Sequence, residues 1–387
     1  MKMRVCIFTD TIGDLNGVSR FIQDMGEQSL SHGFDLHIVS STAKYCPDIP
    51  NVHNLRPRWR IPMPFYKELD IAYPSASALE AKLLELKPDI LHISTPGPVG
   101  FIANRLAHKH GLPTMGTYHT DFPAYVEKQT GLASAKRMAD RVMQKFYRRF
   151  KKVFTRSNAY LGIMENEIGI PRSRSELLPP GTNRHRFHPS HRTEGIFKKY
   201  GSEGEGLKVL YVGRISKEKN VPFLLKVWER YKERRPESDA ELVLVGEGAL
   251  RHDKRFTRLD GIVFTGPVIG EDLSRLYASS DLFVFPSVTD TLGQVVMEAQ
   301  ASGVCCLVSD RGGPQSIVNH RGNPGGLVVK ADDLTAWADA LESLLENVTL
   351  RRHFGQQGYE NMHDFDIADS FRHFAQSHRD VMNALHQ

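Results

Sequence analysis

Short apolar stretches alternate with amphipathic ones along most of the chain, and loops rich in glycine or proline separate them. The first apolar stretch, Arg4–Thr9, is interpreted as a strand and is followed by the loop Asp10–Gly17. A helix is predicted next, because apolar side chains recur there at the spacing of one helical face: Val18, Phe21, Ile22 and Met25.

This alternation runs twice along the chain. In the first half, further strands are predicted at Leu36–Ser40, Ile90–Ser94, Thr114–Tyr118 and Val153–Arg156. The pattern weakens near residue 190 and then resumes, with strands predicted at Leu207–Val212, Glu241–Val245, Ile262–Thr265, Leu282–Pro286, Val304–Ser309 and Leu327–Val329. Strands that alternate with helices favour parallel sheets covered on both faces.

We therefore predict an α/β protein with two Rossmann-like, doubly wound domains that face each other across a cleft. The expected domains are residues 1–188 and 189–365, and residues 366–387 are expected to form a helix that returns to the first domain. The segment Asn51–Pro74 shows no clear period and is interpreted as a long loop.

Composition agrees with two globular domains in a chain of 387 residues, with 40% hydrophobic and 25% charged residues. No apolar run approaches the roughly 20 residues needed to span a bilayer, and the N-terminus lacks the features of a signal peptide. The four cysteines show no metal-binding spacing, which favours buried, reduced thiols in a cytoplasmic protein. The net charge of +5 suits an anionic ligand or surface without proving either.

A basic pair follows the first strand of the second half. Gly213 ends that strand, and Arg214 and Lys219 follow in the same loop. A guanidinium fork and an ammonium together suit a diphosphate, since one gives bidentate contact and the other a point charge. Two basic residues in a loop are also compatible with a solvated surface, so their meaning depends on what lies beside them.

A second cluster follows the strand Leu282–Pro286. We expect Thr289, Asp290 or Thr291 to cap a helix that begins near Leu292. The N–H groups at a helix N-terminus favour phosphate or polarised hydroxyls. The amides expected to serve a ligand in this way belong to Leu292, Gly293, Gln294 and Val295.

Two carboxylates belong to the same cluster. Asp290 and Glu298 lie eight residues apart, so a loop and the helix after it can turn both toward one site. Carboxylates accept hydrogen bonds from vicinal diols, which makes ribose and a hexose natural partners. Taken singly, Asp290 is equally compatible with a plain helix cap and Glu298 with a solvated helix position.

These motifs, in this order, resemble those of the retaining glycosyltransferases of family 4, which have the GT-B architecture of two facing Rossmann-like domains. Arg214 and Lys219 match the family's Arg-x4-Lys diphosphate clamp. Asp290 and Glu298 match its E-x7-E element, with Asp in the first place. The resemblance implies that Asp290 contacts the donor sugar, that Glu298 holds the ribose, and that the backbone near Val268 reads the nucleotide base.

Further segments extend the resemblance over nearly the whole chain: Val245–Gly248, Phe264–Val268, Leu276–Asp281 and Gly325–Val328. The chain also departs from the family pattern. Where many relatives have G-V-D-x-x-x-F, it has Gly181-Thr182-Asn183 and then Phe187, so that Asn183 replaces the acid. Such departures leave the identity of the donor open.

Two motifs of the N-terminal half fit the same family. Asp14–Val18 resembles its first-loop GGV, with Asn16 for one glycine, and Gly17 would let backbone N–H groups approach the diphosphate. Gly116–Tyr125 resembles the Y-H-T-D-x-P-x-Y stretch of members that glycosylate lipid or polyprenyl-like acceptors. Within it, His119 matches the family histidine beside the donor sugar.

The resemblance implies transfer of a hexose, mannose or glucose, from a GDP- or UDP-sugar to a lipid-linked acceptor. It also implies a front-face mechanism, in which Arg214 and Lys219 stabilise the departing diphosphate. The N-terminal domain would then serve the acceptor and the C-terminal domain the nucleotide sugar. The sequence shows no D-x-D metal motif in the right context, so we expect no metal ion and no cofactor besides the donor itself.

A basic stretch raises the question of membrane contact. Lys136–Lys152 holds eight Lys or Arg residues and one Asp, and apolar side chains recur within it at Met138, Val142, Phe146 and Phe150. This pattern predicts an amphipathic helix that lies on an anionic membrane, or one whose apolar stripe packs inside the domain. The basic residues expected at the membrane are Arg137, Arg141, Lys145, Arg148 and Arg149. We expect a cytoplasmic protein, peripheral at the inner face of the membrane.

Three other functions remain as alternatives. The enzyme could glycosylate a soluble small molecule, or the chain could bind sugar nucleotides without catalysis. A dinucleotide oxidoreductase is disfavoured, because Gly246 and Gly248 begin a G-x-G but Arg251 occupies the place of the third glycine. Nothing in the sequence indicates a nucleic-acid partner.

Overall fold

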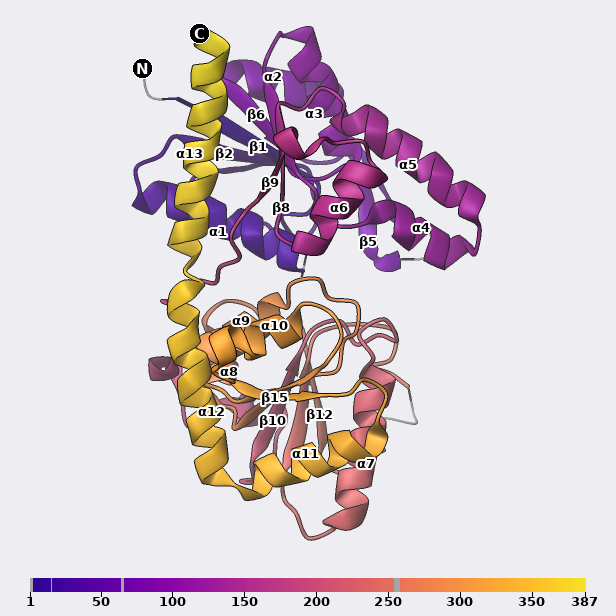
Figure 1. Ribbon diagram of the computed structural model, residues 1–387, viewed down its shortest axis with the longest axis vertical. Coiled ribbons are helices and arrows are strands. Elements are labelled where there is room, and N and C mark those ends of the chain that lie inside the picture. Colours follow the sequence, from indigo (N-terminus) through magenta and orange to yellow (C-terminus); the bar gives the residue numbers. More distant parts are fainter. Residues whose placement is uncertain (1–2, 15, 64–65, 254–257) are drawn as a thin grey trace. The chain divides into compact units, whose positions relative to one another are not determined.

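The computed structural model describes residues 3–14, 16–63, 66–253 and 258–387. The chain forms two compact units: unit 1 comprises Met1–Pro179 and Ala368–Gln387, and unit 2 comprises Pro180–Ile367. Each unit has its own parallel sheet with helices packed around it (Figure 1). The chain passes between the units at residues 179–180 and 367–368, whereas the sequence analysis placed these points at 188–189 and 365–366.

Unit 1 is built on a parallel sheet with the strand order β3-β2-β1-β6-β7-β8-β9. Its strands are β1 (Val5–Thr9), β2 (Leu36–Ser40), β3 (Val52–Asn54), β6 (Ile90–Ile93), β7 (Thr114–Thr117), β8 (Lys152–Thr155) and β9 (Ser175–Leu177). Its helices are α1 (Gly17–Ser31), α2 (Ala76–Leu86), α3 (Pro98–Lys109), α4 (Phe122–Thr130), α5 (Ala133–Tyr147), α6 (Asn158–Asn166) and α13 (Ile367–His386), with a short 3-10 turn, η1, at Arg172–Arg174. Every residue of β1 is buried, as expected for a central strand covered on both faces.

The segment predicted to be a loop contains regular structure instead. β3 adds a parallel edge to the sheet, and β4 (Trp59–Met63) pairs antiparallel with β5 (Tyr66–Tyr73). The Trp59 ring stacks on Tyr73 across this pair, with ring centroids 4.0 Å apart. Trp59, Ile61 and Tyr73 are exposed, so no burial imposes an alternating pattern at these described positions. These positions therefore show no hydrophobic period in the sequence.

Unit 2 has a six-stranded sheet with the order β12-β11-β10-β13-β14-β15, and all of its pairs are parallel. Its strands are β10 (Lys208–Val212), β11 (Glu241–Val245), β12 (Ile262–Gly266), β13 (Leu282–Phe285), β14 (Cys306–Ser309) and β15 (Gly326–Val329). Its helices are α7 (Val221–Arg234), α8 (Gly270–Ser279), α9 (Gln294–Ala301), α10 (Pro314–Val318), α11 (Leu334–Glu346) and α12 (Val348–Asn361). Short 3-10 turns lie at η2 (Pro189–His191), η3 (Ile196–Tyr200), η4 (His320–Gly322) and η5 (Met362–Asp364).

Both sheets have the strand order of a Rossmann fold, which confirms the predicted fold class for each unit. The first strand of each sheet has its sequence neighbours on opposite sides, β1 between β2 and β6 and β10 between β11 and β13. Ligands of such sheets bind beyond the carboxyl ends of the strands at this switch point. The fold therefore directs attention to the loops after β1 and β6 in unit 1, and after β10 and β13 in unit 2.

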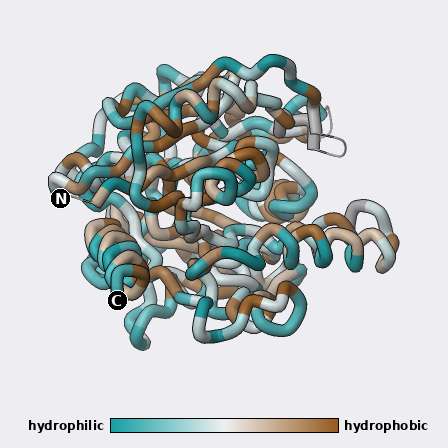
Figure 2. Tube along the Cα trace, turned by 90° about the horizontal axis from the view of Figure 1, so that it is seen from above, coloured by the Kyte–Doolittle hydropathy of each residue, from teal (hydrophilic) through white to brown (hydrophobic). Residues whose placement is uncertain are grey.

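The hydrophobic core of each unit lies between sheet and helices. In unit 2, Trp228 of α7, Phe283 of β13 and Trp337 of α11 are fully buried. Most helices carry hydrophobic and hydrophilic residues side by side along the trace (Figure 2), as expected for helices with one buried face. Within the described ranges, none of the helices combines the length and the apolar character required to cross a membrane.

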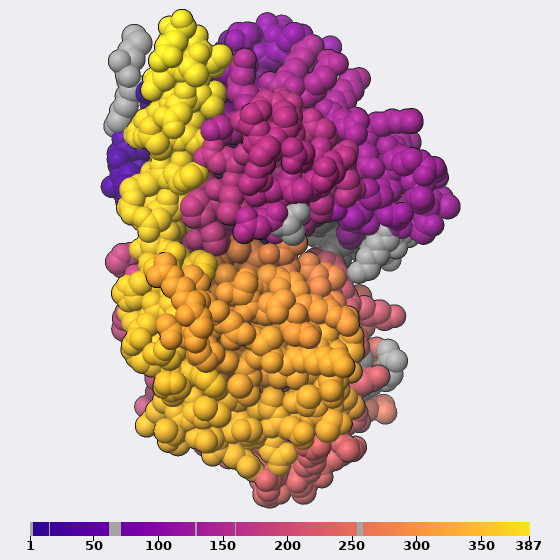
Figure 3. Space-filling model, in the orientation of Figure 1, coloured from indigo at the N-terminus to yellow at the C-terminus, as the bar shows by residue number. Residues whose placement is uncertain are grey.

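The last helix, α13, belongs to unit 1 although the chain reaches it only after unit 2. Figure 3 shows this helix, in yellow, against residues from the first part of the sequence. His378 of α13 contacts His92 of β6, with 3.2 Å between Nε2 and Nδ1, and both side chains are buried. The Phe374 ring packs on Phe154 of β8. α13 is therefore a part of the unit 1 core.

Candidate functional site

An ion pair at the switch point of unit 2 joins two residues singled out in the sequence. Lys219 Nζ lies 2.8 and 2.9 Å from the two carboxylate oxygens of Asp290. Lys219 follows β10 and Asp290 follows β13, and these two strands are neighbours. The sheet therefore brings together a cation and a carboxylate that are far apart in sequence, and both side chains are largely buried.

Arg214 lies in the same loop as Lys219. Its Nη2 donates to the carboxylate of Glu218 at 3.1 Å, an i,i+4 pair that the sequence analysis did not single out although its spacing could have revealed it. The hydroxyl of Tyr211 donates to the carbonyl oxygen of Arg214 at 2.8 Å and so holds the backbone there. Arg214 and Lys219 are thus each held by a carboxylate before any anion arrives.

The backbone around these side chains is closely packed. A Cβ on Gly246 would lie 1.9 Å from the carbonyl oxygen of Gly213, so only glycine allows the loops after β10 and β11 to approach this closely. On the other side, the amide of Gly313 donates to the carbonyl oxygen of Asp290 at 2.7 Å and joins the loop after β14 to the loop after β13. The loops after four neighbouring strands therefore form one tight layer at this edge of the sheet.

The start of α9 differs from the prediction. The helix begins at Gln294 and not near Leu292, and its N-cap is Gly293, which has a left-handed backbone with φ of 82° and makes no side-chain cap. Neither Asp290 nor its threonine neighbours cap the helix, because Lys219 holds the Asp290 carboxylate instead. The turn is closed by backbone instead, since the amide of Val296 donates to the carbonyl oxygen of Gly293 at 2.9 Å.

Glu298 lies one turn further along α9 and is 4% exposed, not solvated. The Tyr277 hydroxyl of α8 donates to its Oε2 at 2.9 Å. Tyr277 belongs to a segment that resembled the family, but no role was assigned to it from the sequence. Val268 precedes α8, and its side chain is buried in the core of unit 2, so Val268 itself can offer a ligand little besides its backbone.

In unit 1, the structure places His119 just beyond β7. Its Nε2 lies 2.9 Å from Ser94 Oγ, at the end of β6, and its ring packs edge-on against Phe21 of α1. Burial and the nearby positive charge of Arg156 lower the pKa of His119 to about 3. The imidazole is therefore neutral at physiological pH and can exchange hydrogen bonds without carrying charge.

Gly17 is the first residue of α1 and is exposed. Asn16, which stands where the family has a glycine, is the N-cap of this helix. Its side-chain oxygen accepts hydrogen bonds from the amides of Val18 at 3.0 Å and Ser19 at 2.9 Å. The departure from the family motif therefore has a structural reason, since asparagine satisfies two first-turn amides and does not engage that of Gly17.

The basic stretch is only partly what the sequence predicted. α5 ends at Tyr147, and Lys152 is already the first residue of β8, so no single helix spans the stretch. Of the predicted apolar stripe, Phe146 and Phe150 are buried in the core of unit 1. These two side chains are buried because a helix that covers a sheet packs one face against it.

The remaining apolar positions of the stripe, Met138 and Val142, are 70% and 42% exposed. The basic residues proposed for membrane contact are exposed as well: Arg137, Arg141, Lys145, Arg148 and Arg149. A smaller surface than predicted is therefore available for contact with a membrane.

In the part of the chain that the structure describes, no three His, Cys, Asp or Glu side chains are close enough to hold a metal ion together. The structure thus describes two groups of candidate residues, each within its own unit. Unit 2 holds Arg214, Lys219, Asp290 and Glu298 in adjacent loops and in α9, and unit 1 holds His119 at the end of β7.

Family models match both halves of the chain. Residues 15–186 match the family described as Glycosyltransferase Family 4, and residues 206–347 match the one described as Glycosyl transferases group 1. Together they cover most of the sequence.

Curated relatives carry related names. The chain is 29% identical to the sulfoquinovosyl transferase SQD2 of Arabidopsis thaliana over 79% of its own length, but the match spans only 59% of that relative. It is 29% identical to a GDP-mannose-dependent alpha-mannosyltransferase of Mycobacterium tuberculosis, over 82% of each chain. It is 24% identical to a D-inositol 3-phosphate glycosyltransferase of Paenarthrobacter aurescens, over 96% of this chain and 95% of the relative.

Solved structures share the fold. A sucrose-phosphate synthase from Thermosynechococcus elongatus superposes with a TM-score of 0.75 at 20% identity, over 99% of this chain and all of the other. HepE from Anabaena, in complex with UDP-glucose, superposes with a TM-score of 0.73 at 16% identity, over 98% of this chain and all of the other. These matches confirm the family and fold that the motifs predicted. The chain belongs to the glycosyltransferases of family 4 and has the GT-B fold.

Proposed function

We propose that this glycosyltransferase moves a hexose, mannose or glucose, from a nucleoside diphosphate sugar to a lipid-linked acceptor with retention of the anomeric configuration. The observation that carries the proposal is the contact between Lys219 and Asp290 at the switch point of unit 2, with Arg214 in the same loop. Two cations beside a carboxylate form a site that can take a diphosphate and the hydroxyls of the sugar attached to it.

The neighbours named above support a nucleotide-sugar donor. Several relatives are GDP-mannose-dependent mannosyltransferases, and HepE is known in complex with UDP-glucose. On this basis Glu298 is assigned to the ribose, the backbone near Val268 to the base, and the amides at the start of α9 to the donor. In unit 1, Gly17 is assigned to the diphosphate and the neutral imidazole of His119 to the donor sugar.

The proposed chemistry is a front-face substitution. The bond between the sugar C1 and the diphosphate oxygen breaks while the acceptor oxygen bonds to C1 from the same face, and the acceptor proton passes to an oxygen of the departing diphosphate. Arg214 and Lys219 stabilise the negative charge that grows on the leaving group. An NMR assignment of the product's anomeric configuration tests retention, and an inverted product would exclude this mechanism.

The donor is identified by thermal shift with GDP, UDP and ADP, because a ligand that binds only the folded state raises its apparent stability. We expect one of the three to raise the Tm of the wild type and to lose this effect in Arg214→Ala. Transfer from the matching sugar nucleotide then establishes catalysis. A wild type that binds one of these nucleotides but neither hydrolyses nor transfers from its sugar would be a non-catalytic sugar-nucleotide-binding protein.

We further propose that no metal ion takes part, because Arg214 and Lys219 supply the positive charge that a diphosphate otherwise draws from Mg²⁺. We expect full turnover of the donor in EDTA. Activity that EDTA abolishes and Mg²⁺ restores would contradict this.

A soluble acceptor is the second candidate. The D-inositol 3-phosphate glycosyltransferase of Paenarthrobacter aurescens matches this chain over nearly its whole length. The stretch around His119 and the exposed basic face of α5 favour a lipid acceptor at a membrane. A competition in which inositol phosphate and a polyprenyl phosphate are offered with the same donor distinguishes them.

A further inference from the structure

Helix α8 connects two parts of the proposed nucleotide site. Its first residue, Gly270, follows the loop of Val268, and near its end Tyr277 reaches α9. The Tyr277 hydroxyl donates to Glu298 Oε2 at 2.9 Å, and Tyr277 is fully buried. One short rigid element therefore sets both the loop assigned to the base and the carboxylate assigned to the ribose.

The Tyr277 ring is held from two sides. Phe187 packs edge-on against it, with ring centroids 5.5 Å apart and an interplanar angle of 89°. Phe283 of β13 lies on another side, 5.7 Å away. Phe187 is itself fully buried. It lies four residues after Asn183, in the segment that departs from the family pattern. Little room remains for the Tyr277 hydroxyl to move away from Glu298.

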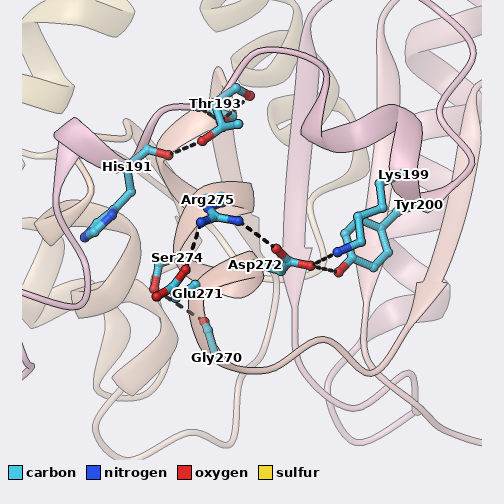
Figure 4. A network of polar contacts seen from close by, with 10 residues as sticks. His191, Thr193, Lys199, Tyr200, Gly270, Glu271, Asp272, Ser274 and Arg275 are labelled. Atoms are coloured by element: carbon cyan, nitrogen blue, oxygen red, sulfur yellow. Dashed lines mark hydrogen bonds and ion pairs between the residues drawn. The ribbon is translucent and has the colours of Figure 1, made fainter.

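The chain between Phe187 and Tyr200, here called the connector, also fixes both ends of α8 (Figure 4). At the first turn, Asp272 accepts a hydrogen bond from the Tyr200 hydroxyl at 2.6 Å and pairs with Lys199. At the last residue, Ser279 Oγ accepts from the amide of Thr193 at 2.9 Å. The connector thus contacts the first turn of α8 through Lys199 and Tyr200, and its last turn through Phe187 and Thr193.

We propose that Tyr277 is a positioning residue for nucleotide recognition, which acts by orienting the Glu298 carboxylate toward the ribose hydroxyls, and that the connector keeps α8 in the place this requires. The inference rests on the proposed function, since it assigns Glu298 to the ribose. A carboxylate on a helix can rotate about its side-chain torsions, and a fixed donor on one oxygen limits that rotation.

The test separates orientation of Glu298 from ordinary core packing. Wild type, Tyr277→Phe, Glu298→Ala and the double variant are titrated by calorimetry. The probes are the nucleoside diphosphate that stabilises the wild type and its 2′,3′-dideoxy analogue. Tyr277→Phe is expected to weaken binding of the ribonucleotide about tenfold, which is the effect of losing one hydrogen bond to a charged group. The affinity for the dideoxy analogue is expected to stay unchanged.

Two further readouts belong to this experiment. The double variant is expected to bind the ribonucleotide as weakly as Glu298→Ala alone, because residues that act as a unit are not additive. The donor KM of Tyr277→Phe is expected to rise about tenfold while kcat stays within about twofold, as for lost uniform binding. Tyr231→Phe is the matched control. Tyr231 is a buried residue near the end of α7, and its hydroxyl contacts Ser238, which lies beyond that helix. Removing this hydroxyl should change none of these values.

Phe187→Leu provides a second route that spares both polar groups. This substitution loosens the packing against Tyr277. We expect it to weaken binding of the ribonucleotide about threefold and to leave binding of the dideoxy analogue unchanged. Equal weakening of both nucleotides, no weakening at all, or additivity with Glu298→Ala would overturn the inference while the proposed function stands. A wild type that binds the two nucleotides equally would remove the ribose assignment of Glu298, and one that binds neither would remove the proposed function too.

Discussion

At the scale of single residues, Lys219 and Asp290 depend on each other. The ammonium contacts both carboxylate oxygens, so each neutralises the other while no donor is bound. Removing one partner of a largely buried pair leaves an uncompensated charge in a poorly solvated place. A diphosphate would therefore meet a cation that is already positioned, beside a carboxylate held to face the sugar.

We predict that Lys219→Ala lowers kcat/KM for the donor by about a hundredfold or more, as expected when a group that stabilises transition-state charge is lost. Steady-state kinetics with the identified sugar nucleotide provides the measurement. Lys217→Ala is the control, because Lys217 is exposed in the same loop and should leave the rate unchanged. Equal losses in the two variants would mean that the loop acts only through its overall charge.

Residue identities in the site were predictable to different degrees. Arg214, Lys219, Asp290 and Glu298 could be found because they follow strands at spacings that a family shares. The direct bond between Lys219 and Asp290 could not, because it depends on β10 and β13 being neighbours in the sheet. The support of Glu298 by Tyr277 was hidden as well, since it depends on how α8 packs against α9 across the intervening strand β13.

At the scale of elements, α9 shows why its starting residue was mispredicted. Thr289, Asp290 and Thr291 are favoured caps by residue type alone, but a left-handed glycine supplies the turn into this helix. A Cβ at Gly293 would lie 3.0 Å from the Pro314 side chain and 3.1 Å from its Cα. The turn is therefore restricted by its own backbone and by its neighbour α10.

We predict that Gly293→Ala destabilises the protein by more than the roughly 1 kcal/mol expected from a left-handed backbone alone, and that it weakens nucleotide binding. Gly322→Ala is the matched control, because Gly322 has a similar φ of 78° but no atom within 4 Å of an added Cβ. Chemical denaturation of both variants gives the difference. If both variants lost the same free energy of unfolding, contact with Pro314 would be unimportant.

The contact between β6 and α13 has a defined hydrogen-bond direction. His378 Nδ1 can only donate to the carbonyl oxygen of Phe374, 2.7 Å away, so its Nε2 accepts from His92 Nδ1. His92 Nε2 in turn accepts from the Thr117 hydroxyl at 2.9 Å. Both imidazoles are neutral in this arrangement, and burial lowers the pKa of His378 to about 4 and that of His92 well below its usual range.

The pH dependence follows from these directions. Above about pH 6.5 the two imidazoles are neutral whether the chain is folded or unfolded, so they add no pH dependence. Below it the unfolded chain takes up protons that the folded chain does not until about pH 4, and the free energy of unfolding falls by roughly 2 kcal/mol or more. Glu176, which favours protonation of His378, and Lys152, which opposes it, are the nearby charges of the sheet.

We therefore predict that His378→Gln flattens the loss of stability between pH 6.5 and 4, measured by urea denaturation at each pH. His386→Gln, at the exposed end of the same helix, should retain the slope of the wild type. If His378→Gln showed the wild-type slope as well, the buried pair would not be the source of the acid sensitivity.

At the scale of the whole molecule, charge and exposed apolar residues coincide on α5. The chain carries a net charge of +5, and Met138 and Val142 lie exposed among the basic side chains of this helix. Such a surface attracts anionic lipid electrostatically. Salt screens this attraction, and the screening length falls from about 10 Å at 0.1 M salt to about 3 Å at 1 M.

We predict co-sedimentation with anionic vesicles at low salt and its loss at high salt. A triple variant of α5 should lose this binding to vesicles. Its substitutions are Arg137→Gln, Arg141→Gln and Lys145→Gln. The control replaces three exposed basic residues of unit 2 in the same way: Lys226, Arg230 and Arg352. An equal effect of the two triple variants would assign the binding to net charge, not to α5.

The arrangement of the whole chain was the most predictable level. Alternating strands and helices imply two doubly wound sheets, because few other folds bury such a pattern, and the strand orders agree with this. The pair β4 and β5 was missed because its described positions Trp59, Ile61 and Tyr73 are exposed and show no alternation. Part of the stripe in α5 was misassigned because sequence alone does not say which face of the helix meets the sheet. The ion pair of Lys219 with Asp290 was not predictable because it depends on contact between segments that are distant in the sequence.

The place of α13 in unit 1 has a consequence for how the protein is made. A ribosome delivers the sheet of unit 1 before unit 2, yet the helix that supplies Phe374 and His378 to this sheet is made only after unit 2. Unit 1 therefore stays unfinished throughout the synthesis of unit 2, with an apolar surface that chaperones can recognise. A premature stop codon anywhere in unit 2 would accordingly disable both halves of the enzyme, including the half that had already been translated in full up to Pro179.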